Sequence, residues 1–423
     1  ILKIKFNLVK IFFYTFKIFL TKNKNNINKK KNYQFIILSH IINKKNFYKK
    51  IDSQFGGIEK KFPPKKTIFF YLDHIKLSQI DLEKKINDNH NFYLNNDCVD
   101  FKIYYKIIKN IFFEFSFFLK KSLKTKKNFD KKFYLACSQY LLSLSTVKNI
   151  SLFYNLEKFI LESNVRTIIT TLEGHPYEFL VFFLKKIHDV KVYAYQHSLV
   201  TNSHFSMFLD IDKDLTYSKL FTNGEISFNF LKTKIKSDKV SILGSNKYKK
   251  RKKLNLQNPS TCLILPTGLE NESKDLLNLC SECLKYKKNK INFILRLHPH
   301  INKDEFIKKN KKLLANIKIS NSTKLEKDIS LSKFVLYRGS SSVIEAMQQG
   351  LIPIYFHDDK NTFQIDPLWQ LKSRIIVNNS YQLYLILKKN NSFKKDIINK
   401  NIKFSNKFYT PIDRKKLNEV IKI

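Results

Sequence analysis

Short apolar runs alternate with longer amphipathic segments throughout the second half of the chain. Apolar runs bounded by turn residues predict buried strands, and apolar positions spaced three or four apart predict helices. The predicted strands are 261–265, 292–297, 317–320, 334–337 and 352–356, and the predicted helices are 273–286, 304–315, 325–332 and 342–349. Alternating strands and helices of this length predict a doubly wound α/β domain, which binds ligands at the carboxyl ends of its strands.

The first half has a weaker pattern. Up to about residue 150, aromatic-rich helical stretches alternate with Lys/Asn runs, and only 68–72 predicts a buried strand, which runs into Asp73 and His74. Further on, strands are predicted at 167–172 and 191–195 with a helix over 176–188 between them, and again at 220–224 and 240–243. A strand, helix, strand unit with such short connections predicts a parallel sheet.

A polar, lysine-rich run over 246–258 separates the two halves and predicts an interdomain linker. A length of 423 residues favours two domains. We therefore predict an N-terminal domain over 1–245, whose first 150 residues are poorly defined and helix-rich, and a C-terminal domain over 259–400. Residues 401–423 are predicted to form a C-terminal helix that packs back on the N-terminal domain.

The formal net charge of +43 points at first to nucleic acid or to an anionic membrane surface. Only six of the 78 basic residues are Arg, however, and Lys, Asn, Ile and Phe are abundant in every segment. These four amino acids share A- and T-rich codons, so we attribute most of the charge to genome composition and expect no specific nucleic-acid partner. A second hypothesis is that the basic surface lets the protein sit on the anionic inner face of the cytoplasmic membrane.

The N-terminal stretch 8–20 is mostly apolar, with polar residues at helical spacing. It is shorter than the roughly 20 residues that cross a bilayer. It is expected to present an amphipathic face to a membrane or, as we favour, to form a buried first element of the N-terminal domain.

Five cysteines form an odd set in a chain too long to need disulfides, which fits a reducing, cytoplasmic compartment. Cys280 and Cys283 have the spacing of a zinc or redox pair. They lack a second pair and fall in a helical pattern, which disfavours both functions.

A serine-rich turn follows the predicted strand 334–337. The turn and the start of the next helix contain Arg338, Gly339, Ser340, Ser341, Ser342 and Glu345. Backbone amides at a helix N-terminus, with hydroxyls and the positive end of the helix dipole beside them, form an anion site suited to phosphate. Ordinary N-capping by one serine is the alternative, but three serines beside an Arg exceed what a cap requires. Glu345 is expected to cap these amides or to reach a ribose hydroxyl.

A second motif ends the predicted strand 292–297. Strand alternation places Arg296 and His298 on the same side, and Pro299 fixes the exit of the chain. A guanidinium and an imidazole at a strand end suit a phosphate or a leaving group, with His298 as a proton donor. Thr267 and Gly268 occupy the equivalent position after 261–265, so we include them in this site.

Two strand ends of the N-terminal half are also unusual: Glu173-Gly174-His175-Pro176 follows 167–172, and Gln196-His197-Ser198 follows 191–195. Side chains at these positions are expected to face the C-terminal half across a cleft. Glu173 is a candidate general base for an acceptor hydroxyl, with His175 and His197 as alternatives. A purely structural explanation is that Glu173 stabilises the N-terminus of the following helix.

The histidine-proline turn, the later pair Ser340 and Ser341 and the helix residue Glu345 together resemble bacterial GT-B glycosyltransferases that use CMP-activated sugars. These are the sialyltransferases and Kdo transferases of capsule and lipopolysaccharide synthesis. The EGHPYE and YQHS segments resemble surface-carbohydrate biosynthesis proteins of that fold, and the resemblance spans about residues 160–370. It implies an α/β, GT-B-like fold of two Rossmann-like doubly wound domains facing a cleft.

The resemblance also implies residue roles: His298, Ser340 and Ser341 contact the nucleotide phosphate, and Glu173 is the base. Here one acidic residue precedes the glycine, where those families often have two. The implied enzyme binds a nucleotide-sugar in its C-terminal domain and a glycan or glycolipid acceptor in its N-terminal domain. No cofactor is expected beyond the nucleotide-sugar co-substrate.

No metal is expected, because no DxD-like pair lies near the phosphate turn and Arg296 and Arg338 could neutralise a leaving phosphate. Two alternatives stay open. The Ser-Ser plus Glu pattern also occurs in CDP-glycerol polymer transferases, so a polyol-phosphate transferase is the alternative of the same fold. A basic nucleic-acid-binding protein is the alternative of a different class.

Overall fold

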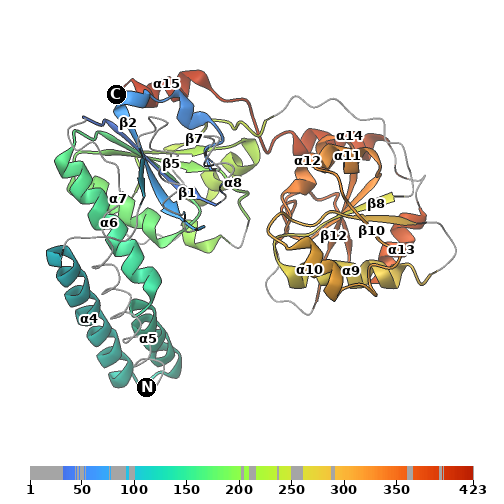
Figure 1. The fold of residues 1–423 in the computed structure, drawn as a ribbon, viewed down its shortest axis with the longest axis horizontal. Helices are drawn as coiled ribbons and strands as arrows, with labels where there is room; N and C mark the ends of the chain where they lie inside the picture. Colours follow the sequence, from blue (N-terminus) through green and yellow to red (C-terminus); the bar gives the residue numbers. More distant parts are fainter. Residues whose placement is uncertain are drawn as a thin grey trace.

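The computed structural model describes residues 32–42, 54–75, 92–94, 101–201, 204–208, 216–235, 238–248, 261–286, 291–359, 365–389 and 395–422, and a few single residues between them. They form two α/β domains that lie side by side (Figure 1). The predicted element over 8–20 and most of the predicted linker over 246–258 lie outside the described residues.

The N-terminal domain contains a parallel sheet of seven strands in the order β3-β2-β1-β4-β5-β6-β7. The strands are β1 (Phe35–Ile41), β2 (Thr67–Asp73), β3 (Phe92–Leu94), β4 (Thr167–Thr171), β5 (Lys191–Gln196), β6 (Lys219–Thr222) and β7 (Val240–Ile242). The strands predicted at 68–72, 167–172 and 191–195 are confirmed. The sequence did not predict β1, although it is central and pairs with both β2 and β4.

Helices cover both faces of this sheet. On one face, α6 (Leu144–Glu162), α7 (Pro176–Ile187) and α8 (Glu225–Ile235) bury their apolar sides against the strands. The other face is covered by a segment containing the short helices η1 (Ile58–Lys61) and η2 (Pro64–Lys66), and by α15 (Arg414–Ile421). Two further helices, α4 (Phe101–Lys124) and α5 (Asn128–Leu141), form a hairpin that extends away from the sheet (Figure 1).

The C-terminal domain contains a parallel sheet of six strands in the order β10-β9-β8-β11-β12-β13. The strands are β8 (Thr261–Leu265), β9 (Asn292–Leu295), β10 (Lys318–Ile319), β11 (Phe334–Tyr337), β12 (Ile352–Phe356) and β13 (Ile375–Val377). The helices are α9 (Glu270–Cys283), α10 (Lys303–Lys309), α11 (Leu325–Ser330), α12 (Ser342–Gln348), α13 (Ser380–Lys388) and α14 (Lys395–Ser405). All five predicted strands are present, and only β13 was not predicted.

Residues 401–423 are divided between two helices. α14 ends at Ser405, and the chain then returns to the N-terminal domain before α15 begins. A Cβ at Gly224 would lie 2.3 Å from the carbonyl oxygen of Phe408, so the returning backbone packs directly on that domain. Leu417 and Val420 of α15 are buried in the N-terminal core. Within the described residues, no helix is long and apolar enough to cross a membrane.

Both sheets have the doubly wound arrangement that the sequence predicted. In each sheet the strand order reverses, between β1 and β4 in one domain and between β8 and β11 in the other. The carboxyl ends of strands at such a switch point form the usual ligand-binding crevice of an open parallel sheet.

Candidate functional site

The motifs singled out in the sequence follow the strands at these two switch points. In the N-terminal domain, β4 leads into Glu173, and β1 carries His40 near its end. In the C-terminal domain, β8 leads into Thr267 and β11 leads into Gly339. The topology therefore supports a functional site at the carboxyl end of each sheet.

The turn after β4 is held by a buried carboxylate. Glu178, in the first turn of α7, accepts hydrogen bonds of 2.8–3.0 Å from the three backbone amides of residues 173–175. Gly174 has a φ of 83°, and a Cβ at this position would lie 2.0 Å from Ser206 Oγ. Glycine is required there because a side chain would be both strained and obstructed. This turn fixes the directions in which Glu173 and His175 leave the strand.

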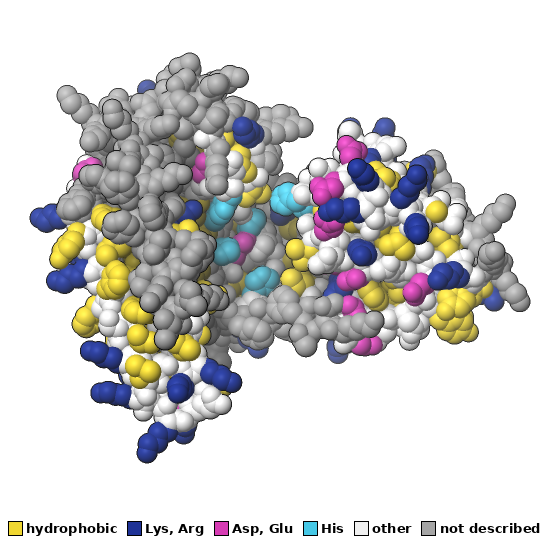
Figure 2. All heavy atoms as spheres, turned by 60° about the horizontal axis from the view of Figure 1, so that its bottom comes forward, with side chains coloured by type: hydrophobic (Ala, Val, Ile, Leu, Met, Phe, Trp, Pro, Cys, Tyr) yellow, Lys and Arg dark blue, Asp and Glu magenta, His cyan; other side chains and the backbone are white. Residues whose placement is uncertain are grey.

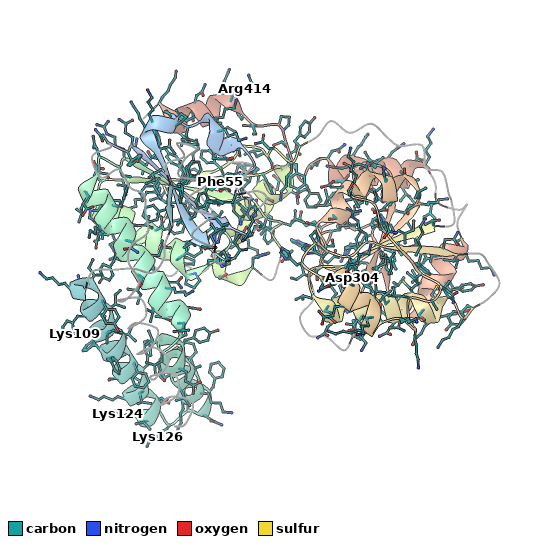
Figure 3. All side chains as sticks on the ribbon, in the orientation of Figure 1. Phe55, Lys109, Lys124, Lys126, Asp304 and Arg414 are labelled. Atoms are coloured by element: carbon teal, nitrogen blue, oxygen red, sulfur yellow. The ribbon has the colours of Figure 1, made fainter. Side chains whose placement is uncertain are left out.

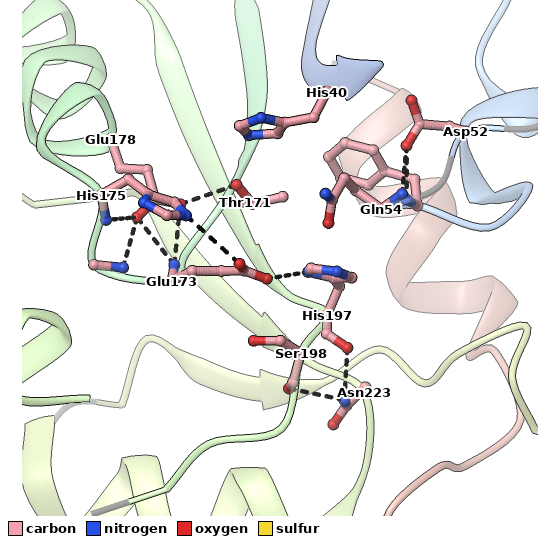
Figure 4. A network of polar contacts seen from close by, with 12 residues as sticks. His40, Asp52, Gln54, Thr171, Glu173, His175, Glu178, His197, Ser198 and Asn223 are labelled. Carbon is pink, nitrogen blue, oxygen red and sulfur yellow. Dashed lines mark hydrogen bonds and ion pairs between the residues drawn. The ribbon is translucent and has the colours of Figure 1, made fainter. Parts of the chain in front are cut away.

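Glu173 lies between two histidines (Figure 4). Its carboxylate forms an ion pair with His197 Nδ1 and lies 3.6 Å from His175 Nε2. Burial acts to raise the pKa of Glu173, but the contacts with both histidines outweigh it and hold this pKa well below its usual range. Glu173 in turn raises the pKa of His175, whose side chain is half-exposed. The three predicted catalytic residues of this domain are thus in contact, with the carboxylate ionised.

A hydrogen-bonded chain that the sequence did not reveal runs beside this group. His40 Nδ1 lies 2.7 Å from His74 Nε2, and His40 Nε2 lies 2.5 Å from the Tyr177 hydroxyl. That hydroxyl is 3.1 Å from Thr171 Oγ1, which donates to Glu178 at 2.9 Å. Burial and the neighbouring imidazoles lower the pKa of His40 to about 3, so its ring is neutral. The only signal in the sequence is that His40 lies near the end of an apolar run and His74 directly after another, and both runs become strands.

The donor of each hydrogen bond in this series of side chains can be assigned by starting from Thr171. Thr171 uses its single proton toward a carboxylate, so the Tyr177 hydroxyl must donate to Thr171. His40 Nε2 then carries a proton and donates to Tyr177, which leaves Nδ1 to accept from His74 Nε2–H. The chain fixes both tautomers and also the Tyr177 ring, on which His175 stacks with centroids 5.5 Å apart.

A pocket of about 780 Å³ lies at the carboxyl end of the C-terminal sheet. Four of its lining residues were predicted from the sequence: Arg296, Pro299, Ser342 and Glu345. The opposite wall is formed by residues 323–326, where Lys324 supplies an exposed cation. Nothing in the sequence distinguished Lys324 from the many other lysines. The pocket is therefore lined by residues of both motifs, but His298, Ser340 and Ser341 are not among its lining residues.

Arg296 holds the loop that forms this wall. Its Nη1 donates to Asp328 at 2.6 Å and to the Ser322 carbonyl at 2.9 Å. Its Nη2 donates to the Thr323 carbonyl at 3.3 Å. Asp328 is buried, and a buried carboxylate requires a paired cation. Arg296 therefore positions the pocket wall, and its direct contact with a phosphate stays a prediction.

The turn after β11 packs on the turn after β8. Gly339 has a φ of 74°, and a Cβ there would lie 2.7 Å from Thr267 Cγ2. Thr267 is held by Glu272, which accepts from its amide and its hydroxyl at 2.9 Å each. Ser341 is the N-cap residue of α12, yet its hydroxyl makes no capping hydrogen bond, and Ser340 is buried. An N-cap hydroxyl that is not committed to its own helix is what the predicted anion site requires.

His298 lies against the turn after β8. A Cβ at Gly268 would lie 3.2 Å from His298 Nδ1, and this nitrogen accepts a hydrogen bond of 3.2 Å from the His300 amide. Burial and the neighbouring His300 lower the pKa of His298, so its ring is neutral at pH 7. A neutral imidazole that accepts through Nδ1 carries its proton on Nε2. His298 is therefore a hydrogen-bond donor without a charge.

Arg338 is not among the residues that line the pocket. Its side chain is buried, with Nη1 3.5 Å from Asp275 and 3.6 Å from Asp358. The guanidinium also lies 5.9 Å from the centre of the Phe356 ring. Arg338 therefore neutralises two carboxylates of its own domain, and its contact with a leaving phosphate stays a prediction.

The two candidate sites lie where the domains face each other. Figure 2 shows histidine side chains gathered on both sides of this junction. Lys247, at the start of the predicted linker, interacts electrostatically with both sites. Its surroundings lower its pKa by desolvation, while the carboxylates of Glu173 and Glu345 act to raise it. One cation therefore interacts with an acidic residue of each domain.

Among the described residues, no group of three or more His, Cys, Asp or Glu side chains is arranged to hold a metal ion. Cys280 and Cys283 are buried in the apolar core with Cys262. Burial raises the pKa of Cys283 to about 12, so its thiol stays protonated. The CxxC spacing therefore reflects the packing of α9.

No protein-family model matches the chain, and curated protein sequences give no significant match. Solved structures do match. MurG of Acinetobacter baumannii aligns over 92% of this chain and 100% of its own, with 9% identity and a TM-score of 0.50. CalG4, the calicheamicin glycosyltransferase, aligns over 92% and 97%, with 9% identity and a TM-score of 0.52. A Listeria monocytogenes protein described as a UDP-N-acetylglucosamine 2-epimerase aligns over 92% and 96%, with 13% identity and a TM-score of 0.52.

Matches at such low identity establish the fold but not the reaction or the substrates. The predicted GT-B-like class, with two Rossmann-like domains, is confirmed. The matched proteins have different names and activities, so the reaction of this chain has to be argued from its own residues.

Proposed function

We propose that the chain is a glycosyltransferase that moves a sugar from a nucleotide-sugar to the acceptor of a growing surface polysaccharide or lipopolysaccharide. The observation that carries the proposal is the Glu173–His175 pair at one switch point, combined with a pocket at the other. Sugar transfer between two bound substrates needs a base for the acceptor and a separate anion site for the donor.

His175 is the proposed general base, and Glu173 is its positioning carboxylate. A carboxylate with a strongly lowered pKa is a weak base, whereas His175 has a raised pKa and a half-exposed ring. In the proposed step, the acceptor oxygen bonds to the sugar, its proton passes to His175, and the bond from the sugar to the nucleotide phosphate breaks. Glu173 stabilises the charge that His175 gains. The sequence favoured Glu173 as the base and His175 as an alternative, so the proposal exchanges their roles.

We propose a CMP-activated acidic sugar as the donor and transfer without a metal ion, at the inner face of the cytoplasmic membrane. The support for CMP is the resemblance of the serine turn and His298 to CMP-sugar transferases. Uncharged donors at Ser341 and His298, together with Lys324, would stabilise the leaving phosphate in place of a metal. CDP-glycerol is the alternative donor of the same fold.

Calorimetric titration with CMP, UDP and CDP-glycerol, followed by transfer assays with the nucleotide that binds, tests the proposal. His298→Ala and Ser341→Ala are expected to abolish transfer while leaving the unfolding temperature unchanged. Ser330→Ala, on α11, is the matched control and should keep full activity.

Full activity of either variant would sink the assignment. Interconversion of UDP-N-acetylglucosamine without an acceptor would instead make the chain an epimerase. Steeply salt-dependent RNA binding without nucleotide binding would favour the nucleic-acid alternative.

A further inference from the structure

The hairpin formed by α4, α5 and the loop 125–127 has an unusual surface. Eight of the exposed large apolar side chains in the described part of the chain lie on these two helices: Tyr105, Phe112, Phe113, Phe117, Leu123, Phe129, Phe133 and Tyr140. Elsewhere, the exposed apolar residues are spread over many elements; the exposed Tyr381, for example, contacts one other exposed ring, that of Tyr286. Scattered residues of this kind are normal for a protein surface. A concentration of exposed aromatic rings on one hairpin marks an interaction surface.

These rings do not belong to the hydrophobic core of the hairpin. The core stripe of α4 contains Ile107, Ile111 and Phe115, which are buried in a small cluster shared with α6. Phe113 lies on the opposite side of α4 from this stripe, and its side chain is 71% exposed. A surface helix normally carries polar residues on its solvent side, but here that side carries aromatic rings.

The second helix repeats the pattern. Phe129, Phe133 and Tyr140 recur at helical spacing along α5, and Phe129 is 80% exposed while Tyr140 is 77% exposed. The rings of α4 and α5 therefore cover a continuous length of the hairpin. The apolar patch at the lower left of Figure 2, where the hairpin lies, is bordered by basic side chains.

The charge around the rings has one sign. Residues 101–141 contain ten lysines and only two acidic residues, Glu114 and Asp130. Lys109, Lys124 and Lys126 extend outward from the hairpin (Figure 3). Pairing this face with a second copy would oppose two strongly basic surfaces. An anionic surface that also accepts aromatic rings fits better, and a bilayer of acidic lipids has both properties.

We propose that the α4–α5 hairpin is the surface by which this protein docks on an anionic lipid bilayer. The aromatic rings enter the interface between headgroups and acyl chains, and the lysines lie against the lipid phosphates. This inference rests on the proposed function for the membrane location. It adds the surface that brings the enzyme to a lipid-linked acceptor. The hairpin extends away from the sheet, so docking leaves the carboxyl ends of the strands uncovered (Figure 1).

Vesicle co-sedimentation of the full chain tests this proposal. Binding to vesicles of phosphatidylglycerol and phosphatidylethanolamine is expected, with at least about 100-fold weaker binding to phosphatidylcholine vesicles or in high salt. Replacing Lys109, Lys120, Lys124 and Lys126 by Gln should weaken binding to acidic vesicles by about 100-fold. The control replaces four exposed lysines of the C-terminal domain, Lys274, Lys308, Lys311 and Lys312, by Gln, and should change binding by less than about threefold.

The aromatic contribution is tested separately. Phe113→Gln, Phe129→Gln and Phe133→Gln together should weaken binding by about tenfold or more and remove its persistence in moderate salt. The control replaces Tyr286, Leu331 and Tyr381 by Gln on the C-terminal domain. Circular dichroism and the unfolding temperature show that each variant is folded.

Three outcomes would overturn the proposal: equal binding to acidic and neutral vesicles, equal loss in the hairpin and control variants, or a dimer in solution that the Phe variants dissociate. Nucleotide titration and transfer to a soluble acceptor are measured on the same preparations. Failure of docking with intact nucleotide binding rejects this inference alone. Docking without any nucleotide binding rejects the proposed enzyme and leaves the membrane surface standing.

Discussion

The two switch points of this molecule are built in different ways. At the N-terminal one, side chains contact side chains. Glu173 pairs with His175 and His197. His40 contacts His74 and Tyr177, which are far from it in the sequence. At the C-terminal one, turns pack on turns, and its two arginines are paired with carboxylates of their own domain. The first arrangement suits moving a proton, and the second suits holding an anion.

This contrast changes what the cationic residues are expected to do. The Arg296 guanidinium is already paired with Asp328, and the Arg338 guanidinium lies beside Asp275 and Asp358. Donors for a bound phosphate would therefore come from serine hydroxyls, helix amides, a neutral His298 and the exposed Lys324. Arg is rare in this sequence, and the two arginines of the C-terminal motifs use their planar donors to hold structure: Arg296 fixes a loop, and Arg338 pairs with carboxylates of its own domain.

Of the variants considered, Glu173→Gln in the N-terminal site should reduce transfer the most. It removes the charge that raises the pKa of His175, so transfer is expected to fall by about 10²–10⁴-fold. Nucleotide affinity, set by the other domain, should not change. Steady-state kinetics and calorimetry separate the two effects.

The matched control is Glu157→Gln. Glu157 of α6 also pairs with a histidine, His188 at the C-cap of α7, at 3.4 Å. This pair is away from the carboxyl ends of the strands, because His188 precedes the start of β5. This variant should keep full activity. Equal losses in the two variants would show that the Glu173 pair has no special role in transfer.

Arg296→Ala tests the C-terminal side and should cost about 3 kcal/mol of unfolding free energy, because it leaves Asp328 buried without its cation. Chemical denaturation of the full chain measures this. The double variant with Asp328→Ala should recover part of the loss, since no unpaired charge is then buried. A loss of nucleotide binding at unchanged stability would show instead that Arg296 contacts the ligand directly.

Gly174→Ala tests how strictly the turn after β4 is shaped. A left-handed φ costs about 1–3 kcal/mol for a residue other than glycine, and here the new Cβ would also overlap Ser206. Gly56→Ala is the control, because its φ is 61° but the atom nearest to the new Cβ, Asn246 Cβ, would be 3.6 Å away. Denaturation midpoints should fall further for Gly174→Ala, and equal shifts would exclude the clash with Ser206.

The smallest expected effect is a pH dependence. His175 must be neutral to accept a proton, and its pKa is raised above the usual histidine range by Glu173. Transfer should therefore rise with pH through this raised pKa and fall about tenfold per pH unit below it. In Glu173→Gln the midpoint should move to lower pH. A flat profile in the unaltered protein would exclude His175 as the base.

The sequence predicted the strands and the residues that follow them because both are local properties. Period-two and period-3.6 patterns are read over a few neighbouring residues, and a turn motif such as EGHP or RGSSS is contiguous. The parallel sheets then bring these ends together without further information. That is why Pro299, Ser342 and Glu345 could be named before the pocket that they line was known.

Some elements escaped prediction because their signals are not local. β1 has an apolar sequence like the other strands, but it lies among aromatic-rich runs without clear periodicity, so its central position depends on pairing with β2 and β4. His40 and His74 gained a role only when those strands became neighbours.

By itself, the sequence determined a two-domain doubly wound fold and predicted a serine turn at a strand end as an anion site, because backbone geometry and periodicity suffice for both inferences. Only the tertiary structure decided which group carries charge. Contacts with His175 and His197 hold Glu173 ionised against the effect of its burial, and Glu173 in turn makes His175 more basic. Burial keeps His40 neutral. These states depend on neighbours supplied by distant segments, and the electrostatic interactions responsible act across space without reference to sequence order.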